Sequence, residues 1–132
     1  MARILIVDDN GMIRQLMRLI LESGDHVVEE AADGELALRH ELSGFDLVIT
    51  DLYMPKVSGF EVIGRARAAG IRAIAVSGGD RLGGQDPLAA ALEQGAALAL
   101  RKPFSVPALL PLVEECLGAD PPSPRVIEYS RT

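Results

Sequence analysis

Five short apolar runs, each followed by a stretch with helical spacing, are the feature that most limits how this chain can fold. The first run, residues 4–7, has no polar position and stops at Asp8, as in a strand that is buried on both faces. We predict strands at residues 4–7, 26–31, 45–50, 71–76 and 96–100, and helices at residues 11–23, 33–42, 58–69, 87–94 and 105–117. Alternation of the two predicts an α/β fold with helices on both faces of a parallel sheet. Because crossover connections are right-handed, we expect a doubly wound five-stranded parallel sheet in the order 2-1-3-4-5.

The length of the chain and its C-terminal composition predict one domain and a tail. The chain has 132 residues, and 48 % of them are hydrophobic, which is enough for one packed core. We assign residues 1–117 to this domain. Residues 118–132 contain Pro121, Pro122 and Pro124 but no long apolar pattern, so we expect a flexible tail there.

The charge and the cysteine content exclude several classes of protein. A formal net charge of −6 lacks the basic surplus that duplex binding needs, so we expect no nucleic-acid partner. The single cysteine, Cys116, excludes an intramolecular disulfide, and we expect it to serve in packing. No leader precedes residues 4–7, and every apolar run is far shorter than the roughly 20 residues that cross a bilayer. We therefore expect a cytoplasmic protein without a membrane partner.

Polar residues stand where four of the predicted strands end, namely Asp8 with Asp9, Asp51, Ser77 and Lys102. The carboxyl ends of parallel strands share one edge of the sheet, where ligands of this architecture bind. Two unit charges 4 Å apart repel by roughly 4 kcal/mol at an effective dielectric of 20, so three carboxylates call for a cation. Oxygen ligands suit a hard ion, and Mg²⁺ is the hard ion that bridges carboxylates to phosphate.

The other strand-end residues suit the chemistry of a phosphoryl group. Lys102 can neutralise one phosphoryl oxygen, and the Ser77 hydroxyl can donate a hydrogen bond to another. That leaves a carboxylate as the attacking group, which forms an acyl phosphate. Asp51 is the central candidate because its strand lies between the other contributors.

These segments resemble the receiver domains of bacterial two-component response regulators, in particular the stand-alone, chemotaxis-regulator-like ones. The matching segments are residues 4–9, residues 51–55 with Gly59, residues 76–77 and residues 102–104. Each is a weak motif alone, but all of them together, in order and at strand ends, are highly specific. The resemblance runs from residue 2 to about residue 117 and implies a flavodoxin-like fold.

The resemblance implies a metal site and a phosphoacceptor. Asp51 would accept the phosphoryl group, Asp9 would ligate Mg²⁺ directly, and Asp8 would act mainly through water. The backbone carbonyl of Tyr53 would complete the metal site.

The resemblance also implies roles for Ser77 and Lys102. Ser77 is similar to the hydroxyl residue that closes on the phosphoryl group, and Lys102 resembles the invariant lysine of the family. The peptide bond between Lys102 and Pro103 is often cis in such domains.

The partners that the resemblance implies are proteins. A histidine kinase or a histidine phosphotransfer protein would supply the phosphoryl group, and an unknown downstream protein would receive the signal. We expect a monomer that can dimerise on phosphorylation, and no enzymatic activity beyond its own phosphorylation and slow autodephosphorylation. A single domain of this length leaves no room for an output domain, so the signal would pass by protein–protein interaction or onward phosphotransfer. We place the interaction face on the fourth and fifth strand–helix units.

Two features depart from the family pattern. Receiver domains often carry an aromatic residue three positions before the lysine, but Ala99 stands there, so an aromatic side chain cannot swing at this point. Residues 78–86 form a loop that is longer and richer in glycine than usual. We hypothesise that this loop becomes ordered on phosphorylation and takes over part of the signal.

Three alternatives come from other classes. A haloacid dehalogenase-type phosphohydrolase would have its acids two residues apart after the first strand, whereas Asp8 and Asp9 are adjacent here. A flavodoxin would need a hydroxyl- and glycine-rich loop at that place, because two carboxylates repel a flavin phosphate. A receiver that only binds partners is disfavoured because all charged site positions are present. We expect His26 and His40 to be surface histidines and not phosphorelay groups.

Overall fold

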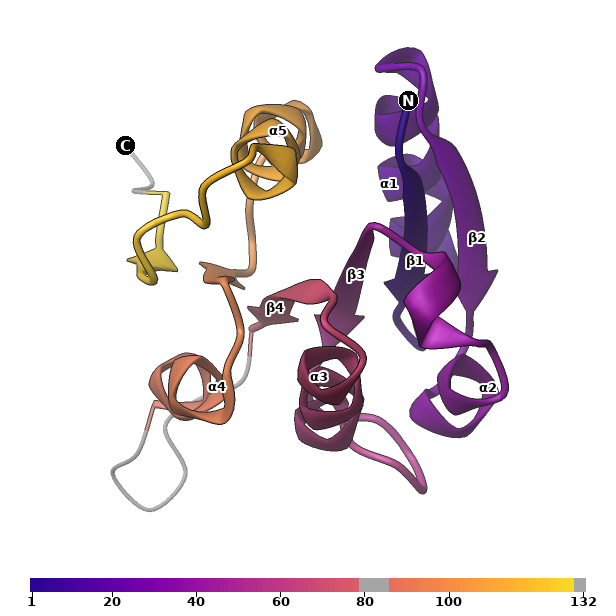
Figure 1. Cartoon of the computed structure of the whole chain (residues 1–132), viewed down its shortest axis with the longest axis vertical. Coiled ribbons are helices and arrows are strands. Elements are labelled where there is room, and N and C mark those ends of the chain that lie inside the picture. Colours follow the sequence, from indigo (N-terminus) through magenta and orange to yellow (C-terminus); the bar gives the residue numbers. More distant parts are fainter. Residues whose placement is uncertain (79–85, 130–132) are drawn as a thin grey trace.

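The computed structural model describes residues 1–78 and 86–129 and contains one sheet flanked by helices (Figure 1). Its strands are β1 (Arg3–Val7), β2 (Val27–Ala31), β3 (Leu47–Asp51), β4 (Arg72–Ser77), β5 (Leu98–Arg101) and β6 (Val126–Ile127). Its α-helices are α1 (Gly11–Ser23), α2 (Gly34–Leu38), α3 (Gly59–Ala68), α4 (Pro87–Gln94) and α5 (Leu109–Leu117). Two 3₁₀ turns, η1 (Leu42–Gly44) and η2 (Val106–Ala108), complete the described secondary structure. Most of the glycine-rich loop, residues 79–85, lies outside the described residues, so its predicted ordering stays a hypothesis.

All neighbouring strands are parallel, and their order is β2-β1-β3-β4-β5-β6. The predicted doubly wound order 2-1-3-4-5 is confirmed, but the predicted number of five strands is wrong. A sixth strand forms because the β-branched residues Val126 and Ile127 pair with Ala99 and Leu100 at the free edge of β5. Residues 126–127 of the predicted flexible tail are therefore held on the sheet.

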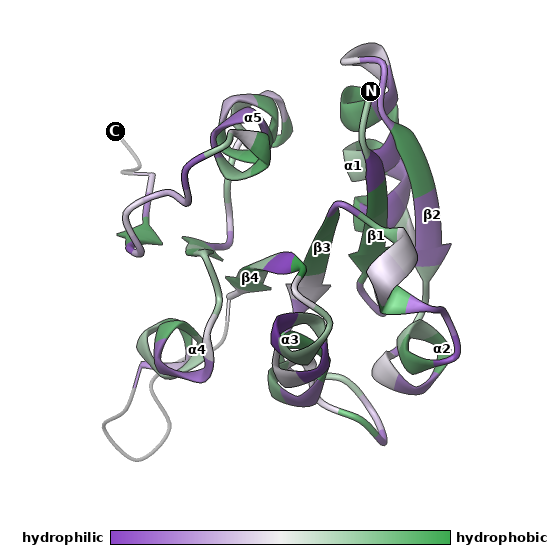
Figure 2. Cartoon of the chain, in the orientation of Figure 1, coloured by the Kyte–Doolittle hydropathy of each residue, from purple (hydrophilic) through white to green (hydrophobic). Residues whose placement is uncertain are grey.

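The core consists of two layers, one on each face of the sheet. Successive strand residues point to opposite faces, so Leu5 and Val7 join one layer while Ile4 and Ile6 join the other. The first layer receives buried residues of α2, α3 and α4, and the second receives buried residues of α1 and α5. Figure 2 shows hydrophobic stretches in β1 and β3, and both strands are buried along most of their length.

Local signals explain where the helices begin and end. Asn10 caps α1 with a side-chain oxygen that accepts a hydrogen bond from the Ile13 amide at 3.1 Å. The helix predicted at residues 105–117 begins instead as the 3₁₀ turn η2, which contains Pro107 near its start. The helix predicted at residues 33–42 already ends at Leu38. Among the described residues, none of these helices is long and apolar enough to span a membrane.

Candidate functional site

Three carboxylates meet at the carboxyl edge of the sheet. Asp8 and Asp9 directly follow β1, and Asp51 ends β3, which is paired with β1 in register up to Val7 and Thr50. One carboxylate oxygen from each aspartate lies within 4.8 Å of the other two. Asp8 is buried and Asp51 is mostly buried, whereas Asp9 is exposed. This oxygen-only set could hold a hard divalent cation.

Lys102 lies beside two of these carboxylates. Its Nζ atom donates to Asp8 Oδ2 at 2.9 Å and to Asp51 Oδ2 at 3.5 Å. Burial acts to lower the pKa of Lys102, but the hydrogen bond and charge of Asp8 and the charge of Asp51 outweigh it and raise that pKa. The lysine therefore stays an ammonium group and neutralises part of the acid cluster.

The Asp51 carboxylate is oriented by the backbone next to it. The Leu52 amide donates to Asp51 Oδ1 at 2.8 Å, which leaves Oδ2 facing Lys102. Burial raises the pKa of Asp51 more than the Lys102 charge lowers it, and the Asp8 charge adds to the increase. The positive charge of Lys102 thus partly offsets the effect of burial, which favours the protonated, uncharged form of Asp51.

Ser77 and Tyr53 lie near the cluster in different environments. Ser77 ends β4 and is buried, and its backbone carbonyl accepts a hydrogen bond from the Lys102 amide at 3.0 Å. The peptide bond that follows, between Lys102 and Pro103, is cis, as the family resemblance implies. Tyr53 has an exposed side chain that packs edge-to-face on Phe60, with ring centroids 6.2 Å apart. The roles assigned to the Ser77 hydroxyl and the Tyr53 carbonyl stay predictions.

Gly59, a residue of the matched motifs, has no room for a side chain. A Cβ atom built on Gly59 would lie 1.8 Å from the Asp51 carbonyl oxygen and 2.8 Å from Leu52 Cα. The Gly59 amide also donates to the Leu52 carbonyl oxygen at 2.8 Å, so the start of α3 is tied to the end of β3. Glycine is required here because two backbone segments approach closely.

Sequence reasoning missed Arg14, which supports the acid cluster from α1. An Arg14 guanidinium nitrogen donates to the Asp8 carbonyl oxygen at 2.7 Å, and its Nε atom pairs with Glu30 at 3.1 Å. The arginine therefore connects the loop after β1 to strand β2. Nothing in the sequence distinguishes it from a solvated helix residue, because its partner on β2 is 16 residues away.

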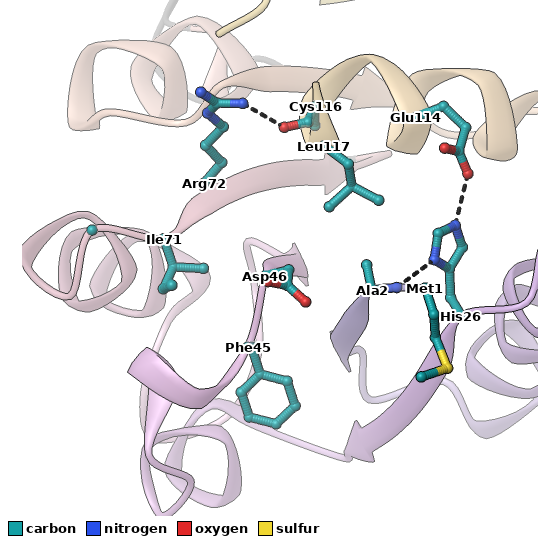
Figure 3. A pocket seen from close by; sticks show the side chains of 11 residues that line it. Met1, Ala2, His26, Phe45, Asp46, Ile71, Arg72, Glu114, Cys116 and Leu117 are labelled. Atoms are coloured by element: carbon teal, nitrogen blue, oxygen red, sulfur yellow. Dashed lines mark hydrogen bonds and ion pairs between the residues drawn. The ribbon is translucent and has the colours of Figure 1, made fainter. Parts of the chain in front are cut away.

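A cavity lies at the opposite end of the sheet (Figure 3). It has a volume of about 500 Å³ and is lined at the amino ends of the strands by residues that include Ala2, His26 and Arg72. The expectation that His26 is a surface histidine is wrong, because only 8 % of the residue is exposed. Its Nδ1 atom accepts from the Ala2 amide at 3.1 Å and its Nε2 atom lies 2.7 Å from a Glu114 oxygen. None of the three clustered aspartates lines this cavity.

Comparisons with known proteins agree with this geometry. A family model described as response regulator receiver domain matches residues 4–114. The transcriptional regulatory protein PdtaR of Mycobacterium tuberculosis is 35 % identical over 114 residues, which cover 85 % of this chain and 55 % of PdtaR. The transcriptional regulatory protein ResD of Bacillus subtilis is 39 % identical over 67 residues, which cover 50 % of this chain and 28 % of ResD. The chain thus spans about half, or less, of these two relatives.

A solved structure is similar to most of this chain. The crystal structure of a CheY-like response regulator receiver domain protein from Methanospirillum hungatei JF-1 matches with a TM-score of 0.76 and 31 % identity. The match covers 87 % of this chain and 92 % of that one. The fold of this chain is therefore similar to that of a solved receiver domain.

Proposed function

This chain belongs to the response regulator receiver domains, and on that basis we propose that Asp51 accepts a phosphoryl group from a phosphohistidine donor in a Mg²⁺-dependent reaction. The observation that carries the proposal is the joint position of Asp51, Lys102 and two further aspartates within a few ångströms. A nucleophile, a positive charge and a cation site together suit phosphoryl transfer, in which positioning and charge stabilisation supply most of the catalysis.

The transfer step follows from the groups present. An oxygen of the Asp51 carboxylate attacks the phosphorus, a P–O bond forms, and the P–N bond to the donor imidazole breaks. The bonding pair stays on the imidazole nitrogen, which then takes a proton. Lys102 already contacts Asp51 Oδ2 at 3.5 Å, so its ammonium is close enough to neutralise a phosphoryl oxygen. The Ser77 hydroxyl, at the end of the next strand, is proposed to donate to another phosphoryl oxygen.

The donor set at this edge fits a magnesium ion. Asp8, Asp9 and Asp51 each offer an oxygen within a 4.8 Å span, and we propose that the Tyr53 carbonyl adds a fourth ligand. Bound Mg²⁺ would supply charge neutralisation between the carboxylates and the phosphoryl oxygens. Asp8 also pairs with Lys102, so we assign Asp9 as the direct ligand and Asp8 as a ligand that acts mainly through water.

The surface beside Lys102 supports docking of a protein donor. Lys102 lines a groove of about 490 Å³ together with Ile13, Leu16 and Phe104. On the outer face of α1, Met12 is 74 %, Leu16 44 % and Leu19 59 % exposed. Their spacing places these three side chains on one stripe of the helix. We propose that the histidine kinase or histidine phosphotransfer protein binds this stripe, because its phosphohistidine must reach the neighbouring Asp51.

We further propose that the chain acts as a cytoplasmic signalling switch and not as a general phosphatase. Its turnover would be limited to its own phosphorylation and slow autodephosphorylation, and its signal would leave by protein contact or onward phosphotransfer. A haloacid dehalogenase-type enzyme would instead hydrolyse small phosphate esters catalytically.

Intact-mass measurement with acetyl phosphate tests the acceptor. We expect the mass of one phosphoryl group to be added when Mg²⁺ is present, and no gain with EDTA or in the Asp51→Asn variant, which keeps the size but not the charge of the nucleophile. A gain that persists in Asp51→Asn would contradict the assignment of the acceptor. No gain in the native chain, with Mg²⁺ bound, would favour a receiver that only binds partners.

A surface variant separates docking of the donor from chemistry. Leu19→Lys places a charge on the α1 stripe at a position that does not line the groove beside Lys102. We expect acetyl phosphate to label this variant at the native rate and a phosphorylated histidine phosphotransfer protein to label it at least tenfold more slowly. Labelling at the native rate by both donors would show that the stripe is not a docking face.

A further inference from the structure

The free edge of β5 is covered by a very short piece of the chain's own C-terminal segment. Only Val126 and Ile127 form β6, which runs parallel to β5. The Ala99 amide donates to the Arg125 carbonyl oxygen at 3.1 Å, as in an added strand of a sheet. The edge of β5 thus has backbone groups that receive an extended segment.

The side chains of this segment meet three different environments on β5. Val126 packs against the core layer under α2, α3 and α4, whereas Ile127 packs against the layer under α1 and α5. Glu128 forms an ion pair with Arg101, the last residue of β5. The edge of β5 therefore accommodates an extended sequence of two apolar residues followed by an acidic one.

Arg101 is held in place to meet that acid. Its guanidinium also pairs with Asp86, the residue that caps α4, and only 22 % of its side chain is exposed. Glu128, by contrast, has 61 % of its side chain exposed. The Arg101 guanidinium is thus mostly buried in the domain, while the carboxylate of Glu128 on the tail is at the surface.

The covering segment is weakly held by comparison with the strands of the core. Val126 and Ile127 are only partly buried, and the ion pair between Arg125 and Glu115 is exposed on both sides. Residues 118–125 connect α5 to β6, and a linker this short keeps the segment close to the edge at high effective concentration. Such an arrangement suits a segment that competes with an outside ligand for the same edge.

We propose that the β5 edge is a docking site for an extended segment of a partner protein, with two apolar residues followed by an acidic one, and that residues 125–128 occupy this site in cis. The partner strand adds in parallel to β5, with main-chain hydrogen bonds for affinity and Arg101 for specificity. This docking does not depend on phosphoryl transfer to Asp51, so the two proposals stand or fall separately.

A labelled peptide tests the proposal on the full chain. The probe is a fluorescein-labelled peptide with the sequence of residues 122–129, and its binding is followed by fluorescence anisotropy. We compare the native chain with a double variant, Val126→Ser with Ile127→Ser, and with Glu128→Lys, a substitution at an exposed position that leaves the core intact. We expect both variants to bind the peptide at least tenfold more tightly than the native chain, because their own segment competes less well.

A charge exchange distinguishes strand docking from nonspecific adhesion. In the tail-weakened double variant, a peptide with Lys at the position of Glu128 should bind at least tenfold more weakly than the original. Adding Arg101→Glu should reverse this preference, and circular dichroism verifies that each variant is folded. Equal affinity for the two peptides, or equal binding by all chains, would overturn the proposal. A dimer detected by light scattering in place of peptide binding would also overturn it, because the occupant would then be a second copy of this chain.

Discussion

At the scale of single residues, the backbone of Asp51 leaves no room for a side chain at Gly59. A Cβ atom there would lie 1.8 Å from the Asp51 carbonyl oxygen, so β3 or α3 has to move. We expect Gly59→Ala to lower the free energy of unfolding by about 1–3 kcal/mol, as overpacking of a filled site does. It should also slow labelling of Asp51 by acetyl phosphate. Urea denaturation and intact-mass kinetics measure the two effects.

Gly64 provides the matched control, because it lies in the same helix. A Cβ atom on Gly64 meets only the end of the flexible Gln94 side chain, at 3.2 Å. Gly64→Ala should therefore leave stability unchanged or raise it by up to about 1 kcal/mol, since alanine favours helices. A destabilisation equal to that of Gly59→Ala would show that close approach to Asp51 is not the cause.

The thiol of Cys116 gives a prediction that depends on pH. Burial raises the pKa of Cys116 to about 11, and the Glu115 charge adds to the increase. An unfolded thiol has a pKa of about 8.5. Between about pH 8.5 and pH 11, Cys116 is therefore deprotonated in the unfolded chain but still protonated in the folded one. The free energy of unfolding thus falls as the pH rises through this range. Below pH 8.5 this contribution to stability is fully present.

Alkylation measures the protection of this thiol. At pH 8 we expect iodoacetamide to react with the native chain roughly a hundredfold more slowly than with the urea-unfolded chain, because far less thiolate is present. The native rate should increase as the pH approaches 11. Equal rates in the two states at pH 8 would contradict both the burial and the raised pKa.

Some site residues could be predicted from the sequence, and others could not, for a physical reason. Asp8, Asp51 and Lys102 were predictable because parallel strands bring their carboxyl ends to one edge. The buried position of His26 was not, since it depends on Glu114, which is 88 residues away and leaves no local pattern. Arg14 was missed for the same reason.

At the scale of elements, α2 depends on a single capping side chain. The Leu36 amide donates to Asp33 Oδ1 at 2.8 Å, and the helix comprises only Gly34–Leu38. We expect Asp33→Ala to lower the free energy of unfolding by about 1 kcal/mol and to speed amide exchange within α2. The exposed Asp120 serves as control, because Asp120→Ala removes the same charge without removing a cap. Unchanged exchange in α2 would argue against the capping role.

The elements that could be predicted well have a local sequence pattern, such as regular apolar spacing or a capping residue. Helix α1 was predicted at its observed bounds, because its apolar spacing is regular and it begins just after the capping residue Asn10. Strand β6 was missed, since two residues are too few for any periodicity. It forms only because β5 presents an edge that a tertiary contact can use.

At the scale of the whole molecule, the two core layers share every central strand. Leu5 and Ile6 are adjacent in β1, fully buried, and belong to opposite layers. We expect Leu5→Ala and Ile6→Ala each to lower the free energy of unfolding by roughly 2–5 kcal/mol. Both variants should still unfold in a single transition, because neither layer can persist without the sheet.

Two probes of unfolding check this coupling. The transitions followed by far-UV circular dichroism and by tyrosine fluorescence should coincide in both variants. Val27→Ala, on the edge strand β2 with 46 % of the residue exposed, should cost much less. Separate transitions for the two layers would mean that they are independent folding units.

The close approach at Gly59 also has a genetic consequence. Every missense change of this codon adds a Cβ atom, and the structure gives that atom no free space beside Asp51. We therefore expect every substitution of Gly59 to have a harmful effect, unlike substitutions of Gly64 in the same helix. In a saturation library selected for signalling, we expect glycine to be the residue recovered at position 59. The cause would be the backbone geometry beside Asp51 and not the chemistry of a side chain.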